Sequence, residues 1–215
     1  MSDEVVVVVS GGESPEPSAA LAVPPDAPVV AADRGLEHAL ALGLEVSVAV
    51  GDFDSASPEA VDVAEASGVR VVRHPRAKDA TDLELALDVA LSMAPTRILV
   101  LAGRGGRLDH ELATLLLLAS DRYVGTQVDA LIGSTDVHVI RGERVLEGEP
   151  GELVSLLPAN GAAVGVTTQG LAYPLHGETL EPGSSRGVSN VFLSETARVG
   201  LSGGVLLAVL PGAKP

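Results

Sequence analysis

The first two thirds of the chain alternate short apolar, β-branched runs with segments of helical pattern. The apolar runs predict strands over residues 4–9, 28–32, 46–50, 69–73 and 97–102. Each run is apolar at nearly every position, which is typical of parallel strands buried on both faces. Helical patterns follow at residues 36–42, 57–67, from 81 onward and at 108–120. Strands and helices that alternate through short connections predict an α/β domain with a mostly parallel sheet covered on both sides.

Two of these helices carry clear start signals. Ser57 and Pro58 open one of them and Gly68 follows its end, which is the usual order of cap, first residue and terminator. Thr81 and Glu84 have the spacing of a capping box at the start of the next helix.

The pattern changes after about Val139, where glycine and proline become frequent and no long helical period remains. The short apolar runs predict strands at 152–157, 163–168, 196–201 and 205–210, with residues 202–204 as the turn of a hairpin. The sequence therefore predicts an α/β domain over residues 1–140 and a smaller all-β domain over residues 141–215.

Composition excludes several classes of protein. The 215 residues include 29 acidic against 14 basic side chains, a net charge of −15, which disfavours binding to nucleic acid. A hydrophobic share of 46% is too high for a disordered chain, and the absence of cysteine excludes disulfides and thiolate metal sites. The start of the chain lacks a secretory signal, and no apolar stretch is long enough to span a membrane. We therefore expect a cytoplasmic protein that does not bind membranes.

Acidic residues gather directly after the predicted strands. They are Asp33, Asp52, Asp54, Asp79 and Asp82. Ligands bind at the carboxyl edge of open α/β sheets, although each aspartate alone could be a turn former or a helix cap. Several carboxylates at one edge would repel one another, and a cation such as Mg²⁺ would relieve that repulsion. In an extended segment Asp52 and Asp54 would point the same way, although an Asx turn made by Asp54 with Ser55 is the alternative.

A glycine-rich turn, GRGGR at residues 103–107, follows the fifth strand and could bring N–H groups and two arginines to phosphates. The sequence contains no Walker A motif, no dinucleotide-binding glycine motif after the first strand and no serine-hydrolase elbow. The five histidines lack metal-ligand spacing. The residues alone therefore indicate Mg²⁺-dependent phosphate chemistry on an α/β sheet.

Six motifs in order resemble the thiamine pyrophosphokinase (thiamine diphosphokinase) family. They are ADRG at 32–35, GDFDS at 51–55, KDATD at 78–82, GRGGRLDH at 103–110, GLAYPL at 170–175 and GSSRGVSN at 183–190. The resemblance implies a homodimer whose α/β domain binds Mg²⁺ and ATP while a β-sandwich domain helps to bind thiamine at the subunit interface. It also implies the reaction, in which the thiamine hydroxyl attacks the β-phosphorus of ATP to give thiamine diphosphate and AMP.

The resemblance also implies roles for individual residues. Asp33, Asp52, Asp54 and Asp82 would form the catalytic site, with Asp52, Asp54 and Asp82 as metal ligands and Asp52 or Asp82 as the acceptor of the hydroxyl proton. The expected ATP and phosphate contacts are Lys78, Asp79, Thr81, Arg104, Gly105, Gly106, Arg107 and Asp109. For Thr81 a helix cap, and for Arg104 a solvated loop residue, are the alternatives.

Thiamine is expected to contact Tyr173, Ser189 and Asn190, with the ring of Tyr173 stacked on the cationic ligand or, alternatively, packed in a sheet. Two positions depart from the family pattern: Val191 stands where many relatives have Glu, and Arg34 where some have Gly. The alternative functions are a catalytically silent thiamine or nucleotide sensor and a Mg²⁺-dependent nucleotide hydrolase.

Overall fold

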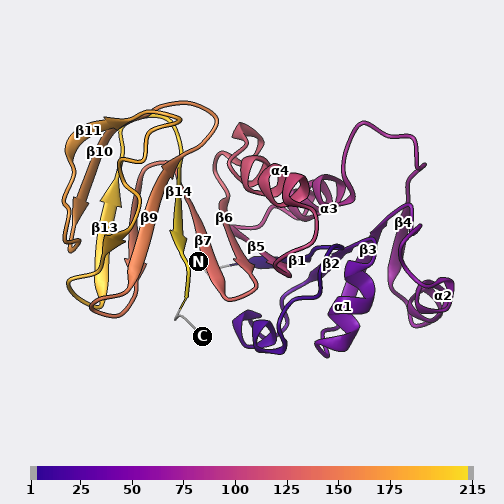
Figure 1. Ribbon diagram of the computed structural model, residues 1–215. Helices are drawn as coiled ribbons and strands as arrows, with labels where there is room; N and C mark the ends of the chain where they lie inside the picture. Colours follow the sequence, from indigo (N-terminus) through magenta and orange to yellow (C-terminus); the bar gives the residue numbers. More distant parts are fainter. Residues whose placement is uncertain (1–3, 213–215) are drawn as a thin grey trace. The chain divides into compact units, whose positions relative to one another are not determined.

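A computed structural model describes residues 4–212 and divides into two compact units (Figure 1). The first unit comprises Met1–Thr114 and Gly125–Gly133, and the second comprises Leu115–Val124 and Ser134–Pro215. The first is an α/β unit and the second is built of antiparallel strands, as the sequence predicts.

The first unit contains a parallel sheet in the order β6-β5-β1-β2-β3-β4. Its strands are β1 (Val5–Val9), β2 (Val29–Ala32), β3 (Val46–Gly51), β4 (Arg70–Arg73), β5 (Arg97–Ala102) and β6 (Gln127–Ile132). The first five correspond to the five predicted strands; most apolar side chains of β1, β2, β3 and β5 are buried, whereas β4 lies at the edge and is only partly buried. The order changes direction at β1, which lies between β2 and β5, and such a switch point is where open α/β sheets bind ligands.

The helices of this sheet cover both of its faces. In Figure 1, α3 (Asp82–Ser92) lies above the sheet and α1 (Gly35–Ala41) lies below it. The remaining helices are η1 (Pro17–Ala22), α2 (Pro58–Ala66) and α4 (Leu108–Leu118), which continues into the second unit. Both predicted helix starts are confirmed, because Ser57 Oγ and Thr81 Oγ1 accept N–H groups three residues on, at 3.1 and 3.2 Å. No helix within residues 4–212 is long and apolar enough to cross a membrane.

Strand β6 is absent from the prediction because polar residues interrupt its apolar run. Asp129 lies in the middle of the strand with 1% of its surface exposed. Its carboxylate accepts hydrogen bonds from Arg97 Nε on β5 at 2.7 Å and from Gln127 Nε2 at 3.0 Å. An ion pair between the buried Asp129 and the half-buried Arg97 thus joins the neighbouring strands at a position where an apolar pair was expected.

The second unit has two groups of antiparallel strands, in the orders β12-β9-β14-β7 and β11-β10-β13-β8. Buried side chains from both groups, among them Leu156, Val166 and Phe192, form one core. The elements are η2 (Asp121–Tyr123), β7 (Thr135–Ile140), β8 (Glu143–Glu147), β9 (Leu153–Pro158), β10 (Ala163–Gln169), β11 (His176–Leu180), β12 (Asn190–Val191), β13 (Thr196–Gly200) and β14 (Leu206–Leu210).

The predicted hairpin around residues 202–204 is wrong. Strand β13 pairs with β10 and β8, whereas β14 pairs with β7 and β9. The turn therefore carries the chain from one group of strands to the other. Gly204 has a φ of +83°, and a Cβ there would lie 2.2 Å from the carbonyl oxygen of Ala162. This close approach explains the glycine without a hairpin.

Candidate functional site

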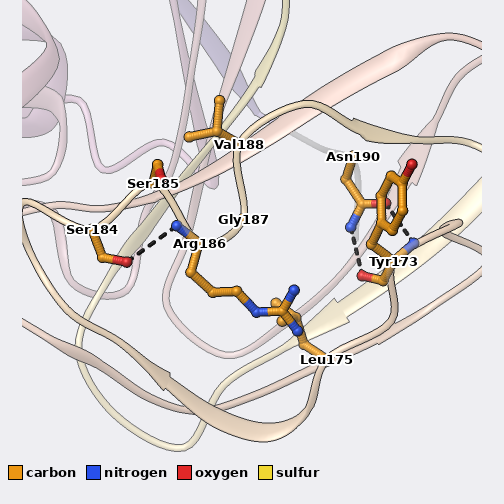
Figure 2. Close-up of a pocket in the computed structure, with 8 residues that line it drawn as sticks. All are labelled: Tyr173, Leu175, Ser184, Ser185, Arg186, Gly187, Val188 and Asn190. Atoms are coloured by element: carbon orange, nitrogen blue, oxygen red, sulfur yellow. Dashed lines mark hydrogen bonds between the residues drawn. The ribbon is translucent and has the colours of Figure 1, made fainter.

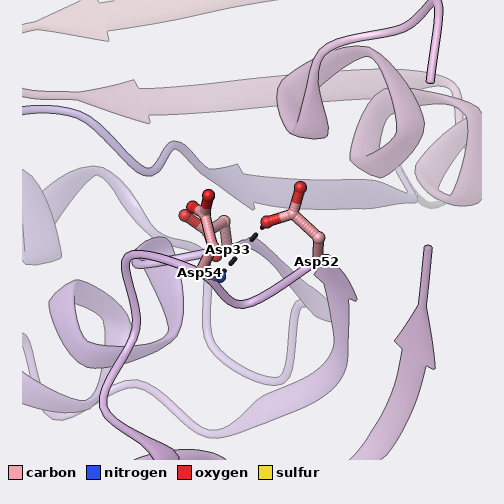
Figure 3. A group of neighbouring side chains, drawn as sticks. All are labelled: Asp33, Asp52 and Asp54. Atoms are coloured by element: carbon pink, nitrogen blue, oxygen red, sulfur yellow. Dashed lines mark hydrogen bonds between the residues drawn. The ribbon is translucent and has the colours of Figure 1, made fainter. Parts of the chain in front are cut away.

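Three aspartates converge at the carboxyl ends of β2 and β3. One carboxylate oxygen from each of Asp33, Asp52 and Asp54 lies within 4.8 Å of the other two (Figure 3). Asp33 follows β2 and the other two follow β3, which is the neighbouring strand. The edge of the sheet thus brings together three of the four residues predicted for the catalytic site.

Asp33 is the buried member of this acidic cluster, with 8% of its surface exposed. It has a φ of +50°, a conformation that is uncommon outside glycine, and its N–H donates to Val50 O at 2.8 Å. Its Oδ2 accepts a hydrogen bond from Ser55 Oγ, while its Oδ1 is buried and has no hydrogen-bond partner within residues 4–212. A buried carboxylate oxygen without a partner is costly, so this atom is poised for a ligand.

Asp52 and Asp54 meet in a way that differs from the prediction of an extended segment. Phe53 between them has a φ of +55°, so the chain turns, and Asp54 N donates to Asp52 Oδ1 at 3.1 Å. This Asx turn is made by the side chain of Asp52, whereas the alternative to an extended segment placed such a turn at Asp54 and Ser55. The turn nevertheless keeps both carboxylates in the cluster, with Asp54 exposed and 3.5 Å from Arg76 Nη2.

Lys78 connects the cluster to the fourth predicted catalytic residue. Its Nζ lies 2.6 Å from Asp52 Oδ2 and 3.0 Å from Asp82 Oδ1. Asp82 is the first residue of α3. The hydrogen bond from Lys78 lowers the pKa of Asp52, against the smaller opposing effect of burial. Burial by itself would lower the pKa of Lys78, but its two carboxylate partners together outweigh burial and raise it. Both groups are therefore charged at neutral pH.

The lowered pKa of Asp52 predicts how stability depends on pH. Its folded-state pKa lies below the ordinary value of 3.8, so its stabilising contribution is complete above that value and is lost as the pH falls through the folded-state pKa. Below about pH 4, wild type should therefore lose unfolding free energy faster than Asp52→Asn. Urea unfolding at pH 7, 5 and 3.5 measures this, with Asp62→Asn on α2 as the exposed control; parallel curves for wild type and Asp52→Asn would contradict it.

The glycine-rich turn after β5 is folded around carboxylates of the same unit. Gly105 and Gly106 have φ values of +105° and +80°, which only glycine adopts easily. Gly105 N donates to Glu111 Oε1 at 2.6 Å, and Arg107 pairs with Asp109 at 2.6 Å. Arg104, Asp79 and Asp109 are exposed. The predicted phosphate donors are thus present, and Glu111 and Asp109 hold two of them.

The donor set of the acidic cluster fits a hard divalent cation. All of its ligand atoms are carboxylate oxygens, and one of them is the unpartnered buried Oδ1 of Asp33. Mg²⁺ prefers such oxygen ligands and commonly shares them with substrate phosphates.

Thr81 was predicted as a phosphate contact, with a helix cap as the alternative. Its hydroxyl accepts Glu84 N at the N-cap of α3.

The second unit has its own cavity, of about 370 Å³, which is the size of a small-ligand pocket (Figure 2). It is lined by Tyr173, Leu175, Ser184, Ser185, Arg186, Gly187, Val188 and Asn190. Tyr173 keeps 61% of its surface exposed, and its ring is therefore free of the sheet packing considered as its alternative. Arg186 is paired with Glu178 through two contacts of 2.9 Å.

Asn190 binds the protein backbone with most of its amide group. Its Oδ1 accepts from Tyr173 N at 2.9 Å and its Nδ2 donates to Tyr173 O at 2.8 Å (Figure 2). The same Oδ1 also accepts from Val191 N at 2.9 Å. Only 2% of its surface is exposed. Ser189 beside it is exposed, has a φ of +55° and donates its N–H to Ser155 Oγ. Asn190 thus fixes the backbone that carries the Tyr173 ring.

Three contributions at these sites are not assigned from the sequence. Ser55 lies in the GDFDS motif, but its bond to Asp33 depends on β2 and β3 being neighbours. Glu111, in the first turn of α4, accepts the N–H of Gly105 in the loop before the helix, and Glu111 belongs to none of the six motifs. Arg186 lies in the last motif and lines the cavity, which only the folded loop shows.

The fold and the acidic cluster define a class of proteins with two units, an α/β unit that carries a carboxylate site at the ends of its parallel strands and a unit of antiparallel strands. A family profile described as "Thiamin pyrophosphokinase, catalytic domain" matches residues 25–129, and one described as "Thiamin pyrophosphokinase, vitamin B1 binding domain" matches residues 137–206. The chain belongs to the thiamine pyrophosphokinase family.

Individual relatives agree with this assignment. The chain is 26% identical to the thiamine pyrophosphokinase of Bacillus subtilis (strain 168) over 182 residues, 84% of this chain and 85% of that protein. It is 30% identical to thiamine pyrophosphokinase 1 of Oryza sativa subsp. japonica over 69% of this chain and 60% of that protein. A crystal structure of thiamine pyrophosphokinase from Bacillus subtilis matches with a TM-score of 0.85 at 24% identity, covering 98% and 100% of the two chains, and supports the fold.

Proposed function

We propose that the protein transfers the pyrophosphoryl group of ATP to the hydroxyl of thiamine, giving thiamine diphosphate and AMP. The observation that carries this proposal is the acidic cluster, with its unpartnered Asp33 oxygen, at the ligand-binding edge of a family-typical sheet. The bond that forms joins the thiamine oxygen to the β-phosphorus, and the bond that breaks joins the β-phosphorus to the oxygen that leaves with AMP. The hydroxyl proton needs an acceptor, for which Asp52 and Asp82 remain the candidates.

Asp52, Asp54 and Asp82 are proposed as the residues that hold Mg²⁺, with Asp33 as a further oxygen donor in the cluster. When bound, the cation would neutralise phosphate charge and orient the polyphosphate. Lys78, Arg104 and Arg107 would contribute positive charge to the phosphates, and Gly105 and Gly106 their N–H groups. Asp79, Thr81 and Asp109 would shape the loops that carry them. Positioning and charge would then supply most of the catalysis, since phosphoryl transfer needs little covalent help.

An AMP-release assay with ATP, Mg²⁺ and thiamine tests the reaction directly. AMP should form only when thiamine is present, together with one equivalent of thiamine diphosphate. Equal AMP formation without thiamine would indicate a nucleotide hydrolase, and ligand binding without turnover would indicate a sensor.

The cytoplasmic location predicted from the sequence stays a prediction.

For thiamine we propose contacts with Tyr173, Ser189 and Asn190, in which Tyr173 stacks on the cationic ring and Asn190 holds Tyr173 in place. Tyr173→Ala should raise the KM for thiamine about fivefold, as expected for the loss of a cation–π contact of about 1 kcal/mol at an exposed site. Asn190→Ala should raise the KM similarly and also lower the Tm, because it removes the Oδ1 acceptor of the part-buried N–H groups of Tyr173 and Val191. Steady-state kinetics and thermal melting measure both, and an unchanged KM in Asn190→Ala would contradict the positioning role.

We propose a homodimer, and the outer face of α4 supports this proposal. Leu108 and Leu112, one turn apart, are 68% and 53% exposed. Large exposed apolar side chains on one helix face favour association with a second copy. Leu112→Glu should therefore shift the protein from dimer to monomer in light scattering coupled to size-exclusion chromatography. Glu59→Lys on α2 serves as the matched surface control, and a dimer that persists in Leu112→Glu would place the interface elsewhere.

A further inference from the structure

Lys78 is held between two carboxylates that come from different elements. Its Nζ lies 2.6 Å from Asp52 Oδ2, after β3, and 3.0 Å from Asp82 Oδ1, at the start of α3. The Lys78 side chain is only 13% exposed. The Lys78 ammonium therefore lies between the carboxylates of Asp52 and Asp82.

Asp52 has both carboxylate oxygens engaged in this arrangement. Oδ2 accepts from Lys78, and Oδ1 accepts from Asp54 N at 3.1 Å. The other two carboxylates differ from Asp52: Asp33 Oδ1 is buried and has no hydrogen-bond partner within residues 4–212, and the buried Asp82 Oδ1 has only its ion pair with Lys78. A divalent cation that bound to both Asp33 and Asp52 would come close to the Lys78 ammonium, and like charges a few ångströms apart repel strongly at a partly buried site. Binding of the cation through Asp52 therefore requires the ammonium to move.

We infer that Lys78 is a resident counter-ion that makes binding of the divalent cation depend on the nucleotide. A cation arriving alone would displace Lys78 from two carboxylates without offering it another anion. A cation arriving with a triphosphate brings phosphate oxygens to which the ammonium can transfer. This inference rests on the proposed function, and it makes Lys78 a positioning residue that sets the order in which ligands enter.

Binding of Mn²⁺ to the whole protein, followed by the EPR signal of the free ion, tests the inference without turnover. Lys78→Gln should bind Mn²⁺ alone about tenfold more tightly than wild type, because the competing charge is gone. With α,β-methylene-ATP, which cannot transfer the pyrophosphoryl group, the same variant should bind the Mn²⁺–nucleotide complex more weakly than wild type. Lys78→Arg keeps the charge and should resemble wild type with Mn²⁺ alone.

Arg73→Gln is the matched control, since it removes a positive charge from the end of β4 where Arg73 pairs with Glu65 on α2. If Lys78→Gln binds Mn²⁺ alone no more tightly than Arg73→Gln does, the inference is wrong. Thermal melting with and without Mn²⁺ gives a second readout: the ion should raise the Tm of Lys78→Gln more than that of wild type. Failure of the proposed reaction would instead appear as absence of thiamine-dependent AMP release, which these binding measurements do not involve.

Discussion

Asp54→Ala is expected to abolish turnover while the protein remains folded. Its carboxylate belongs to the acidic cluster, and loss of a proposed Mg²⁺ ligand at the reacting phosphates should lower kcat by about 10³-fold. Its role in folding is small, because its recorded ion pair is with Arg76, at 3.5 Å, and the two side chains are 45% and 74% exposed. Such exposed pairs contribute at most about 1 kcal/mol to the unfolding free energy.

Arg76→Gln provides the control for this experiment. It breaks the same ion pair from the other side and leaves all carboxylates of the cluster in place. Thiamine-dependent AMP release and thermal melting should therefore separate the two variants: both should melt near wild type, and only Asp54→Ala should lose activity. Activity near that of wild type in Asp54→Ala would remove Asp54 from the proposed metal site.

The parallel sheet could be predicted from the sequence because its strands carry a local signal. Strands such as β1 and β3 are apolar on both faces, and Ser57 and Thr81 mark helix starts by their own side chains. Strand β6 was not predicted because the polar residues Gln127 and Asp129 interrupt its apolar run, and the partner of Asp129 is Arg97, a contact that exists only once β5 and β6 are neighbours. A local hydrophobic pattern carries no information about a contact between residues that are 32 positions apart in the sequence.

In the candidate site, too, the sequence predicts which residues take part but not how they contact one another. Its members could be predicted from aspartates that follow strands, because parallel strands end at one edge. Their contacts could not: the positive φ of Phe53 turns the segment that was expected to be extended, and Ser55 bonds to Asp33 across two strands. The hairpin expected at residues 202–204 failed for a related reason, since the turn residues gave no information about which strands β13 and β14 would join.

Gly35→Ala is expected to destabilise the protein strongly, although alanine is the better helix former by about 1 kcal/mol. A Cβ at Gly35, the first residue of α1, would lie 2.2 Å from the carbonyl oxygen of Val9 and 2.9 Å from its carbonyl carbon. Backbone atoms of a central strand cannot give way as a flexible side chain would. We expect the overpacking to outweigh the gain in propensity and to cost about 2–3 kcal/mol, which corresponds to a Tm lower by roughly 5–10 °C.

The same substitution should affect activity, because Gly35 lies two residues from Asp33 and an outward shift of α1 is expected to move Asp33 relative to Asp52 and Asp54. Gly12→Ala is the matched control, since a Cβ there meets no atom within 4 Å, and it should melt within about 1 °C of wild type. Thermal melting and AMP release show whether the close approach of α1 to β1 requires a glycine at position 35. If Gly35→Ala melts like Gly12→Ala, the close approach of α1 to β1 does not constrain this position, and the glycine of the ADRG motif needs another explanation. If the Tm falls and activity falls with it, the motif glycine is required because it lets the helix approach the strand closely enough to place Asp33 at the edge of the sheet.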